Sequence, residues 1–426
     1  MRDVWAGADL GSTNIKVLLT DGAGTVLARA SRPTPRIGVH SDPDALVDAL
    51  EELLLTAAHD LGPVRLRAVC VAGVGEDGVL HASGRPLGPA LPWFAPQRQA
   101  ALDALRSLRG EDDRRRYGVE LDAARTVAAW ALLPATDVCA ATGWVSCTDY
   151  PALRWTGRAV MSASLAPRTG AWLLDEERWD ADRVEPFLPV ELLPEVVPAG
   201  TVLGPLRAPR LVAAGVLAHD AVVVAGGHDH PVGGAVVHRQ DPGAPLDSMG
   251  TAEVLVRTIP GDRPAPTGVD LSPAVIDDGW TALTVIELDR NVSWLRRHGL
   301  GPAVDAVVAG KVTPADAGLF LPGDEGGGEP RWAPAAHGLS DAERAFAAIH
   351  RLALVGAEAL GRLAPEAEAV YAAGGWTRAP GWMRLKASAT GMPYWVLAEP
   401  ELTALGAAQL CLGDAAEPVP VRAIEP

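Results

Sequence analysis

The sequence predicts an α/β protein built from two similar domains, and three features of the chain lead to this fold class. Its 426 residues are 48% hydrophobic, which is enough for a large core and fits two domains better than one. Its opening segment has the pattern of three strands, a helix and a fourth strand. A segment with a related pattern begins near residue 221, which indicates a duplication.

The opening segment is predicted from its turns and its apolar spacing. Gly-Ser-Thr and Asp-Gly-Ala-Gly turns separate β-branched runs, so we expect strands at residues 4–11, 14–21 and 25–31. A helix should begin at Ser41-Asp42-Pro43, because apolar residues then recur at helical spacing as far as Leu61. A buried strand at 67–75 completes the unit. A Rossmann fold is excluded, since its first strand would enter a helix directly.

The second unit is predicted from a similar series of elements. We expect a strand at 221–227, a short helix at 231–239 and two strands within 246–258 that turn at Gly250-Thr251. The segment from Asp247 to Thr251 places small hydroxyl residues at a strand-to-strand turn, as does the segment from Asp9 to Thr13. We therefore expect a first domain of residues 1–218 and a second domain of residues 219–426.

Composition excludes several classes of protein. The net charge of −16 argues against a broad surface for nucleic acid, whose binding depends on Lys and Arg. No apolar run reaches the roughly 18 residues of a membrane span, and the N-terminus lacks the layout of a signal peptide. The four cysteines show no CxxC spacing that would indicate zinc or a disulfide framework. We expect a cytoplasmic protein without nucleic acid or membrane partners.

A phosphate loop is predicted at Gly11-Ser12-Thr13. Backbone N–H groups can approach phosphate where no side chain blocks them, and Lys16 adds a positive charge. Asp9, at the end of a strand, is a candidate ligand for Mg²⁺, which prefers oxygen. The alternative is an ordinary hairpin turn with a solvated lysine.

Gly226 to His230 is the densest group of proton-handling side chains, and it follows an apolar strand. Asp229 is predicted to accept the proton of an attacking hydroxyl, as a general base. His228 and His230 would lie on opposite faces if the strand continued, so one of them would share the surroundings of Asp229. The alternative for the two histidines is a metal cluster.

A third segment, residues 369–391, has the pattern of a strand, a Gly374-Gly375 turn and a helix. The turn is either a plain strand-to-helix connection or a place where a nucleotide base or ribose lies against bare backbone.

Together these segments resemble the FGGY family of carbohydrate kinases over nearly the whole chain. The resemblance is carried by Asp9 to Lys16, Gly75 to Gly78, Pro92-Trp93-Phe94, Gly227 to His230, Gly250-Thr251 and Gly374-Gly375, followed by Ala404 to Ala408. It implies an actin-like (ribonuclease H-like) duplicated two-domain ATPase fold with nucleotide and sugar in an interdomain cleft. It also implies ATP and Mg²⁺ as cofactors.

The resemblance assigns roles to individual residues. For the nucleotide it implies Gly11, Ser12, Thr13, Lys16, Gly250, Thr251, Gly374, Gly375, Trp376 and Arg378. For the acceptor it implies Glu76, Asp77, Trp93, Arg98, His228 and His230. Asp229 is the implied catalytic base, and Asp9 and Asp229 are the implied metal ligands.

The expected function is ATP-dependent phosphorylation of a small sugar, polyol or sugar-like cyclitol. Ala95 and Pro96 stand where many relatives carry an acidic sugar contact, so the acceptor is expected to differ from a common pentulose. One alternative is a kinase for an atypical cyclitol or modified sugar of secondary metabolism. The other is a non-catalytic sensor of nucleotide or sugar with the same fold. Expected partners are a small polyhydroxylated substrate and a second copy of the chain in a homodimer.

Overall fold

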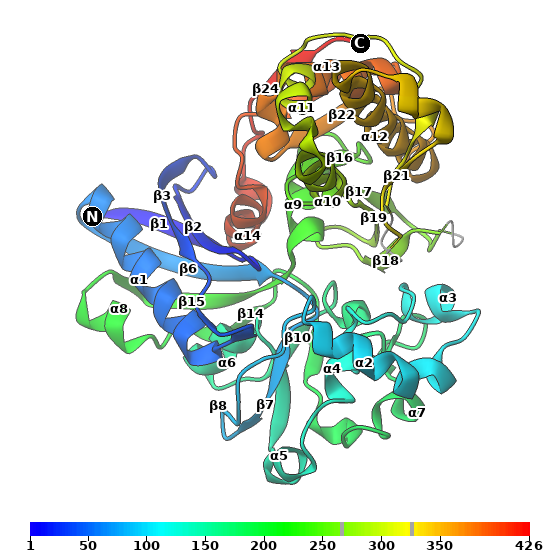
Figure 1. Cartoon of the computed structure of the whole chain (residues 1–426). Helices are drawn as coiled ribbons and strands as arrows, with labels where there is room; N and C mark the ends of the chain where they lie inside the picture. Colours follow the sequence, from blue (N-terminus) through cyan, green and yellow to red (C-terminus); the bar gives the residue numbers. More distant parts are fainter. Residues whose placement is uncertain (265–267, 324–327) are drawn as a thin grey trace. The chain divides into compact units, whose positions relative to one another are not determined.

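A six-stranded sheet with the order β14-β15-β6-β1-β2-β3 forms the centre of the first half of the chain (Figure 1). The computed structural model describes residues 1–264, 268–323 and 328–426. The strands of this sheet are β1 (Arg2–Leu10), β2 (Asn14–Thr20), β3 (Val26–Pro33), β6 (Val64–Gly73), β14 (Val202–Pro205) and β15 (Leu217–His228). Strand β1 is antiparallel to β2 and parallel to β6, which is parallel to β15. The predicted three strands, helix and strand are confirmed.

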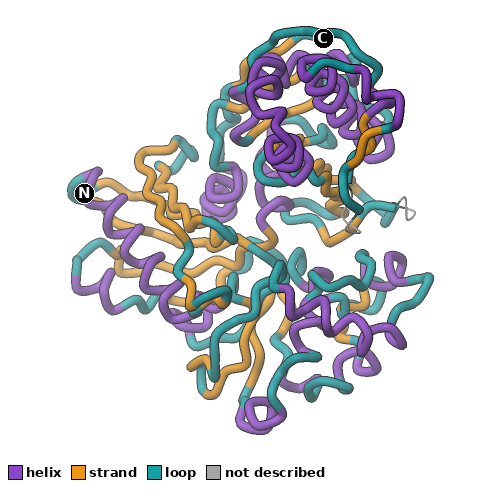
Figure 2. The backbone as a smooth tube through the Cα atoms, in the orientation of Figure 1, coloured by secondary structure: helices purple, strands orange, loops and turns teal. Residues whose placement is uncertain are grey.

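Helix α1 (Pro43–Leu61) covers one face of this sheet, where helices (purple) flank the strands (orange) in Figure 2. The Asp42 carboxylate accepts a hydrogen bond from the Ala45 N–H at 3.2 Å, which caps the helix where the sequence predicted its start. Leu46 and Leu50 of α1 are buried in one core with Ala6, Ala8 and Leu10 of β1.

Helix α14 (Leu402–Leu412) packs on the opposite face of the sheet. Successive side chains of a strand point to alternate sides, so the strands supply apolar side chains to both faces. Gly7 permits this packing, since a Cβ atom there would lie 1.9 Å from the Ala404 carbonyl oxygen. A small residue at this position therefore sets how closely the helix approaches β1.

The segment between β6 and β14 adds shorter elements around a second core, in which the Trp130 and Trp144 rings meet edge to face with centroids 5.5 Å apart. Its strands are β7 (Gly78–Ala82), β8 (Arg85–Pro86), β9 (Gly143–Ser146), β10 (Val160–Ser162), β11 (Trp172–Leu173), β12 (Arg178–Trp179) and β13 (Glu195–Val197). Its helices are α2 (Pro96–Leu105), α3 (Asp113–Tyr117), α4 (Thr126–Trp130), α5 (Ala135–Ala140), α6 (Tyr150–Thr156) and α7 (Ala181–Val184). Before and after this segment lie β4 (Arg36–Ile37), β5 (His40–Ser41) and α8 (Pro209–Ala213).

A second sheet has the order β18-β19-β17-β16-β22-β23-β24. Its strands are β16 (Leu246–Met249), β17 (Glu253–Pro260), β18 (Asp270–Pro273), β19 (Gly279–Ile286), β22 (Val370–Ala373), β23 (Tyr394–Leu397) and β24 (Val421–Ile424). Strand β16 is antiparallel to β17 and parallel to β22, which is parallel to β23. These four strands repeat the pairing of β2, β1, β6 and β15, so the predicted duplication is confirmed.

The remaining elements follow α8 along the chain. The helices are α9 (Asp229–Gln240), α10 (Leu288–Leu295), α11 (Gly301–Val308), α12 (Asp341–Leu363) and α13 (Pro380–Thr390). A small hairpin joins β20 (Phe320–Leu321) to β21 (Arg331–Trp332).

The chain divides into two compact units made of separate segments. The first comprises Met1–Val236, Ile259–Thr281 and Glu401–Pro418, and the second comprises Val237–Thr258, Ala282–Pro400 and Val419–Pro426. The expected division between residues 218 and 219 falls inside β15, whose pairing with β6 keeps it in the first sheet. An apolar strand carries no local signal of the sheet that it joins, so only the structure shows that β15 pairs in the first sheet.

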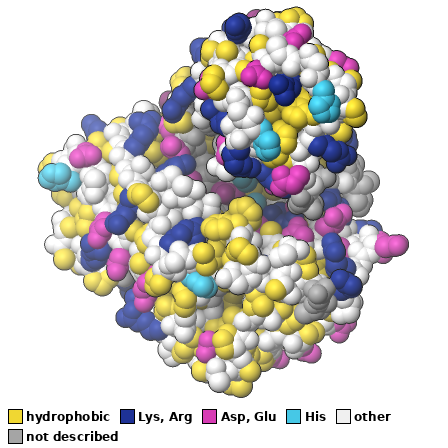
Figure 3. Space-filling model, in the orientation of Figure 1, with side chains coloured by type: hydrophobic (Ala, Val, Ile, Leu, Met, Phe, Trp, Pro, Cys, Tyr) yellow, Lys and Arg dark blue, Asp and Glu magenta, His cyan; other side chains and the backbone are white. Residues whose placement is uncertain are grey.

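On the face shown in Figure 3, Lys and Arg side chains are interspersed with Asp and Glu. Within the part of the chain that the structure describes, no helix has both the length and the apolar character that a bilayer-spanning segment requires.

An ion cluster is fully buried in the second unit. The Lys386 ammonium lies 3.0 Å from Asp247 Oδ2 and also contacts Glu253 Oε1. Gly356 of α12 leaves room for it, because a Cβ atom there would lie 2.2 Å from Lys386 Nζ. Burial raises the pKa of Glu253 to about 7, because it disfavours the charged carboxylate. The Lys386 charge opposes this shift and therefore stabilises the ionised form of the carboxylate.

We therefore predict that Lys386→Met destabilises the protein by about 3–5 kcal/mol, because it leaves two buried carboxylates without their cation. Lys311→Met is the matched control, since Lys311 is exposed and its loss should change stability by less than about 0.5 kcal/mol. Urea unfolding followed by circular dichroism measures both. Equal unfolding midpoints for the two variants would contradict the role of Lys386 as the stabilising cation of the buried cluster.

Candidate active site

Three strands of the first sheet end in one row. Leu10 and His228 both pair with Gly73, so β1, β6 and β15 stop at the same level. A Cβ atom on Gly73 would lie 2.7 Å from the Leu10 carbonyl oxygen and 2.8 Å from Thr148 Oγ1, which leaves room only for glycine. The loops that begin at residues 11 and 74 and the helix α9 that begins at residue 229 therefore start side by side at the carboxyl edge of the sheet, where α/β proteins build their sites.

The loop at residues 11–13 connects β1 to β2, as the sequence predicted. The β1–β2 register places Lys16 opposite Asp9, and the Lys16 ammonium lies 3.5 Å from Asp9 Oδ2. The same ammonium lies 2.6 Å from Glu401 Oε2. Two carboxylates thus share one lysine at the base of the loop.

Asp9 has the surroundings of a cation ligand. Burial raises its pKa to about 7, and although Lys16 opposes this effect, the charges of Asp229 and Glu401 add to it. Its Oδ1 atom is buried and has no hydrogen-bond partner among the described residues. A divalent cation would satisfy that oxygen and relieve the repulsion, so the site fits Mg²⁺ held by one or two carboxylates. Among the described residues, no three His, Cys, Asp or Glu side chains form a metal-binding group.

Asp229 lies where β15 ends and α9 begins. Its Oδ1 accepts a hydrogen bond from the His230 N–H at 2.7 Å, which holds the carboxylate at the first turn of the helix. Its carbonyl oxygen accepts a bond from the Thr403 hydroxyl at 3.2 Å. The carboxylate is partly exposed, so it is held in place while one side stays open.

His228 is buried directly beside this carboxylate. Its Nε2 lies 3.2 Å from Asp229 Oδ1, whereas His230 Nε2 lies 3.8 Å away. Burial lowers the pKa of His228 to about 3; nearby Asp229 opposes this shift and the Arg168 charge adds to it. His228 is therefore neutral, and its buried Nδ1 has no partner among the described residues.

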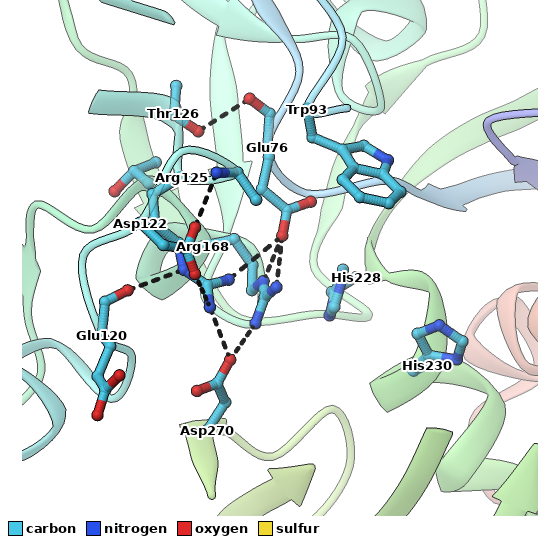
Figure 4. A network of polar contacts seen from close by, with 12 residues as sticks. Glu76, Trp93, Glu120, Asp122, Arg125, Thr126, Arg168, His228, His230 and Asp270 are labelled. Atoms are coloured by element: carbon cyan, nitrogen blue, oxygen red, sulfur yellow. Dashed lines mark hydrogen bonds and ion pairs between the residues drawn. The ribbon is translucent and has the colours of Figure 1, made fainter. Parts of the chain in front are cut away.

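Five charged side chains form a network next to His228 (Figure 4). The Arg168 guanidinium donates from Nε to Glu76 Oε1 at 2.7 Å and from Nη1 to Asp270 Oδ2 at 2.7 Å. Arg125 donates from Nη2 to the same Asp270 oxygen at 3.1 Å, and its Nη2 lies 3.2 Å from Asp122 Oδ2. Both arginines are thus paired with carboxylates at the wall of the site.

The sequence identified only Glu76 of this network. Arg168 was missed because nothing local in the sequence pairs it with Asp270. The structure also gives it a close neighbour: a Cβ atom on Gly75 would lie 2.7 Å from Arg168 Cγ and 3.2 Å from His228 Cδ2. The Arg168 side chain and the His228 ring thus both lie close to Gly75 in the loop after β6.

Asp77 and Arg98 hold the aromatic loop in place. Arg98 is 0% exposed, and it donates to the carbonyl oxygens of Leu91 at 2.6 Å and Ala124 at 2.8 Å. Asp77 Oδ1 lies 3.4 Å from the Arg98 guanidinium and accepts the Trp93 N–H at 2.6 Å. These bonds fix the backbone that leads into Trp93, and the expected contact of Asp77 and Arg98 with an acceptor stays a prediction.

Trp93 and Phe94 are large aromatic side chains that remain 40% and 45% exposed. Their rings meet edge to face with centroids 5.4 Å apart. In Figure 4 the Trp93 indole lies on the side of Glu76 that faces His228. An exposed aromatic face beside polar groups is suited to the C–H face of a sugar ring.

The two predicted nucleotide segments of the second unit meet each other. Gly374 has a φ of +95°, and a Cβ atom there would lie 2.3 Å from the Met249 carbonyl oxygen, directly before Gly250. The N–H of Gly250 donates to Ala252 at 2.9 Å and the Thr251 carbonyl accepts from the Asp289 N–H at 3.0 Å. The loop at residues 250–251 is thus a tight turn against the Gly374 backbone.

The other predicted nucleotide residues lie next to this turn. Gly375 has open space around its Cα atom, Trp376 is half-buried against Trp382, and Arg378 is exposed. The Trp382 Nε1–H points at the Met249 sulfur, 3.0 Å away. The 374–378 segment is therefore anchored to β16 on one side and open on the other.

Comparison with known proteins gives consistent results. The model of the FGGY family of carbohydrate kinases, N-terminal domain, matches residues 4–235. A glycerol kinase of Gloeobacter violaceus is 28% identical over 366 residues, which cover 78% of this chain and 69% of that protein. Solved structures of a gluconate kinase and a xylulose kinase from Lactobacillus acidophilus each superpose with a TM-score of 0.85 and cover 100% of this chain and 94% of their own. At 17% and 18% identity, these structures show that the fold is the same.

We predict that His228 stays neutral from pH 8 to pH 5, because its pKa is lowered from 6.5 to about 3. In the unfolded chain the same ring takes up a proton near pH 6.5, so the free energy of unfolding falls by about 2 kcal/mol between pH 7 and pH 5 from this group. NMR titration of the histidine ring signals, assigned with His228→Gln, tests the first point. That variant should lose less stability on acidification than the native protein, and a His228 signal that titrates near pH 6.5 would overturn the assignment.

Proposed function

Because the chain belongs to the FGGY family of carbohydrate kinases, and is therefore an ATP-dependent kinase of a small sugar or polyol, we propose that Asp229 is its general base. The observation that carries this proposal is the position of Asp229. Its carboxylate is partly exposed, fixed by the His230 N–H at 2.7 Å, and placed at the carboxyl edge of three parallel strands.

The proposed step moves one proton and one phosphoryl group. The acceptor oxygen forms a bond to the γ-phosphorus of ATP, the bond from that phosphorus to the bridging oxygen breaks, and ADP leaves. The hydroxyl proton passes to the Asp229 carboxylate. Because phosphoryl transfer depends mainly on positioning and charge stabilisation, one well-placed carboxylate suffices.

His228 is proposed to orient both Asp229 and the acceptor. With its proton on Nε2, the neutral ring donates to Asp229 Oδ1, 3.2 Å away, and keeps Nδ1 as an acceptor for a substrate hydroxyl. Its low pKa supports this role, since a charged imidazolium would have no acceptor to offer. His230, at 3.8 Å from the same oxygen, is the more exposed of the pair.

Nucleotide-contacting residues are proposed in each unit. Backbone N–H groups of Gly11, Ser12 and Thr13 with the Lys16 ammonium would hold phosphate in the first unit. In the second unit the Gly250-Thr251 turn would offer the Thr251 N–H, since the Gly250 N–H donates to Ala252. Gly374, Gly375, Trp376 and Arg378 would accommodate the adenosine. Mg²⁺ bound by Asp9 and Asp229 would neutralise part of the phosphate charge.

We propose a cytoplasmic location, because ATP is available there. The homodimer stays a prediction.

The acceptor is proposed to be an uncharged polyol or sugar rather than a sugar acid. Arg98, Arg125 and Arg168 each contact a carboxylate, at 3.4, 3.1 and 2.7 Å. His228 adds no charge, so a carboxylate-bearing acceptor would meet Glu76 and Asp77 without a free cation from these residues. Trp93 would stack on the C–H face of the acceptor.

An atypical cyclitol or modified sugar is a second candidate, and one observation favours it. Ala95, in place of the acidic residue of many relatives, is only 3% exposed, so the loop offers no carboxylate to a sugar hydroxyl. The neighbouring Phe94 ring is exposed instead. An acceptor with one hydroxyl fewer, or with an apolar substituent, would suit this surface.

Asp229→Asn should lower kcat by about 10²–10⁴-fold and leave the affinity for ADP without Mg²⁺ nearly unchanged, because it removes the proton acceptor and preserves the shape. Asp220→Asn is the control, since Asp220 lies on the same strand, β15, with its side chain 61% exposed. Coupled measurement of ADP release and calorimetric titration with ADP report the two effects. Full turnover by Asp229→Asn would exclude the general base.

A panel of acceptors tests the proposed substrate class. ADP release should be stimulated by uncharged polyols, ketoses or cyclitols at least about tenfold more than by gluconate, because Arg98, Arg125 and Arg168 each already contact a carboxylate. Preference for gluconate would contradict the proposed class. No stimulation by any acceptor, together with retained ADP binding, would instead favour a non-catalytic sensor.

A further inference from the structure

The carbonyl groups of the 11–13 loop are all held by one short segment, Thr34 to Arg36. The Thr34 hydroxyl donates to the Gly11 carbonyl at 2.7 Å, and the Thr34 N–H donates to the Thr13 carbonyl at 2.9 Å. Between them, the Arg36 guanidinium donates to the Ser12 carbonyl. Three consecutive carbonyls thus point toward the same segment.

This arrangement fixes the opposite face of the loop. In a planar trans peptide, the C=O of one residue and the N–H of the next point in opposite directions. With the carbonyls of Gly11 and Ser12 turned toward Thr34 and Arg36, the N–H groups of Ser12 and Thr13 face away from them. The loop is thereby shaped for an anion before any ligand arrives.

Arg36 also reaches the aromatic loop. Its guanidinium carbon lies 4.9 Å from the centre of the Phe94 ring, within the range of a cation–π contact. A second hydrogen bond of the Arg36 guanidinium, from Nη1 to the Val39 carbonyl at 3.2 Å, fixes the guanidinium plane. One half-buried side chain therefore contacts the 11–13 loop and the Trp93-Phe94 loop at the same time.

The backbone reinforces this connection. Ser41, at the end of the hairpin that begins with Arg36, exchanges two hydrogen bonds with Ala90, at 3.0 and 2.8 Å. Ala90 precedes Trp93 by three residues, and the Trp93 N–H is held by Asp77. Movement of the hairpin would therefore shift the aromatic loop.

We propose that Arg36 is a positioning residue that couples nucleotide binding at the 11–13 loop to ordering of the Trp93-Phe94 loop. The inference rests on the proposed function, in which the first loop binds phosphate and the second binds the acceptor. Phosphate on the N–H face stiffens the loop, the Ser12 carbonyl holds the guanidinium more firmly, and the guanidinium fixes the Phe94 ring. The coupling is reciprocal, so an ordered aromatic loop strengthens nucleotide binding.

The chemistry of arginine is essential to this coupling. A planar guanidinium can donate in its plane to Ser12 and Val39 while its face lies against an aromatic ring. Lysine keeps the charge but has no such plane, so Arg36→Lys should break the coupling without removing the positive charge. Phe94→Leu removes the ring and leaves the 11–13 loop intact. Arg32→Lys is the matched control, because Arg32 lies on the neighbouring strand and pairs with Glu52 in solvent.

The experiment is hydrogen–deuterium exchange of the full chain with and without MgADP. In the native protein and in Arg32→Lys, MgADP should slow exchange about five- to tenfold in two segments, residues 10–16 and 88–95. In Arg36→Lys and Phe94→Leu, protection should persist at 10–16 and be lost at 88–95. Circular dichroism shows whether each variant is folded.

The outcomes separate the inference from the proposed function. If MgADP protects neither segment of the native protein, the first loop does not bind phosphate. The coupling through Arg36 and the proposed function are then both contradicted. If it protects residues 10–16 but not 88–95, or if Arg36→Lys and Phe94→Leu keep both protections, the coupling is wrong and the proposed function stands.

Discussion

The parallel pairing of β6 with β1 and β15 is the constraint on which the candidate site depends. Because Leu10, Gly73 and His228 stand in one row, the loops that follow them leave the sheet together. The β1–β2 turn, the Glu76-Asp77 loop and Asp229 come from positions more than 60 residues apart in sequence. Close approach is possible because Gly73 has no side chain between the Leu10 carbonyl and Thr148.

Charge is distributed unevenly over this edge of the sheet. On the side of Glu76, Arg125 and Arg168 are each paired with carboxylates in a largely buried network. On the side of Asp9, carboxylates outnumber the single lysine, and burial raises the pKa of Asp9 to about 7. This difference in charge is the basis for proposing the acceptor on the first side and the cation on the second.

The two units share a topology, but an aspartate on strand β1 of the first and an aspartate on strand β16 of the second have different surroundings. Asp9 is the next-to-last residue of β1, and Asp247 is the second residue of β16. Each keeps one buried oxygen without a hydrogen-bond partner among the described residues, but the Lys16 beside Asp9 is partly exposed, whereas the Lys386 beside Asp247 is fully buried. The aspartate of this strand thus lies at the candidate site in the first unit and in the core of the second unit.

The sequence by itself determined the α/β fold class, the duplication, the turns at residues 11–13 and 250–251 and the helix capped by Asp42, because each depends on residues close together in the chain. It also led to the prediction of Asp9, Lys16 and Asp229 as site residues, because their residue types near strand ends indicate this chemistry. Only the tertiary structure decided that β15 joins the first sheet, that Arg98 is buried, and that Arg168 pairs with Asp270, 102 residues away. These depend on which segments pack together, and neither apolar runs nor charged side chains carry a local signal of their distant partners.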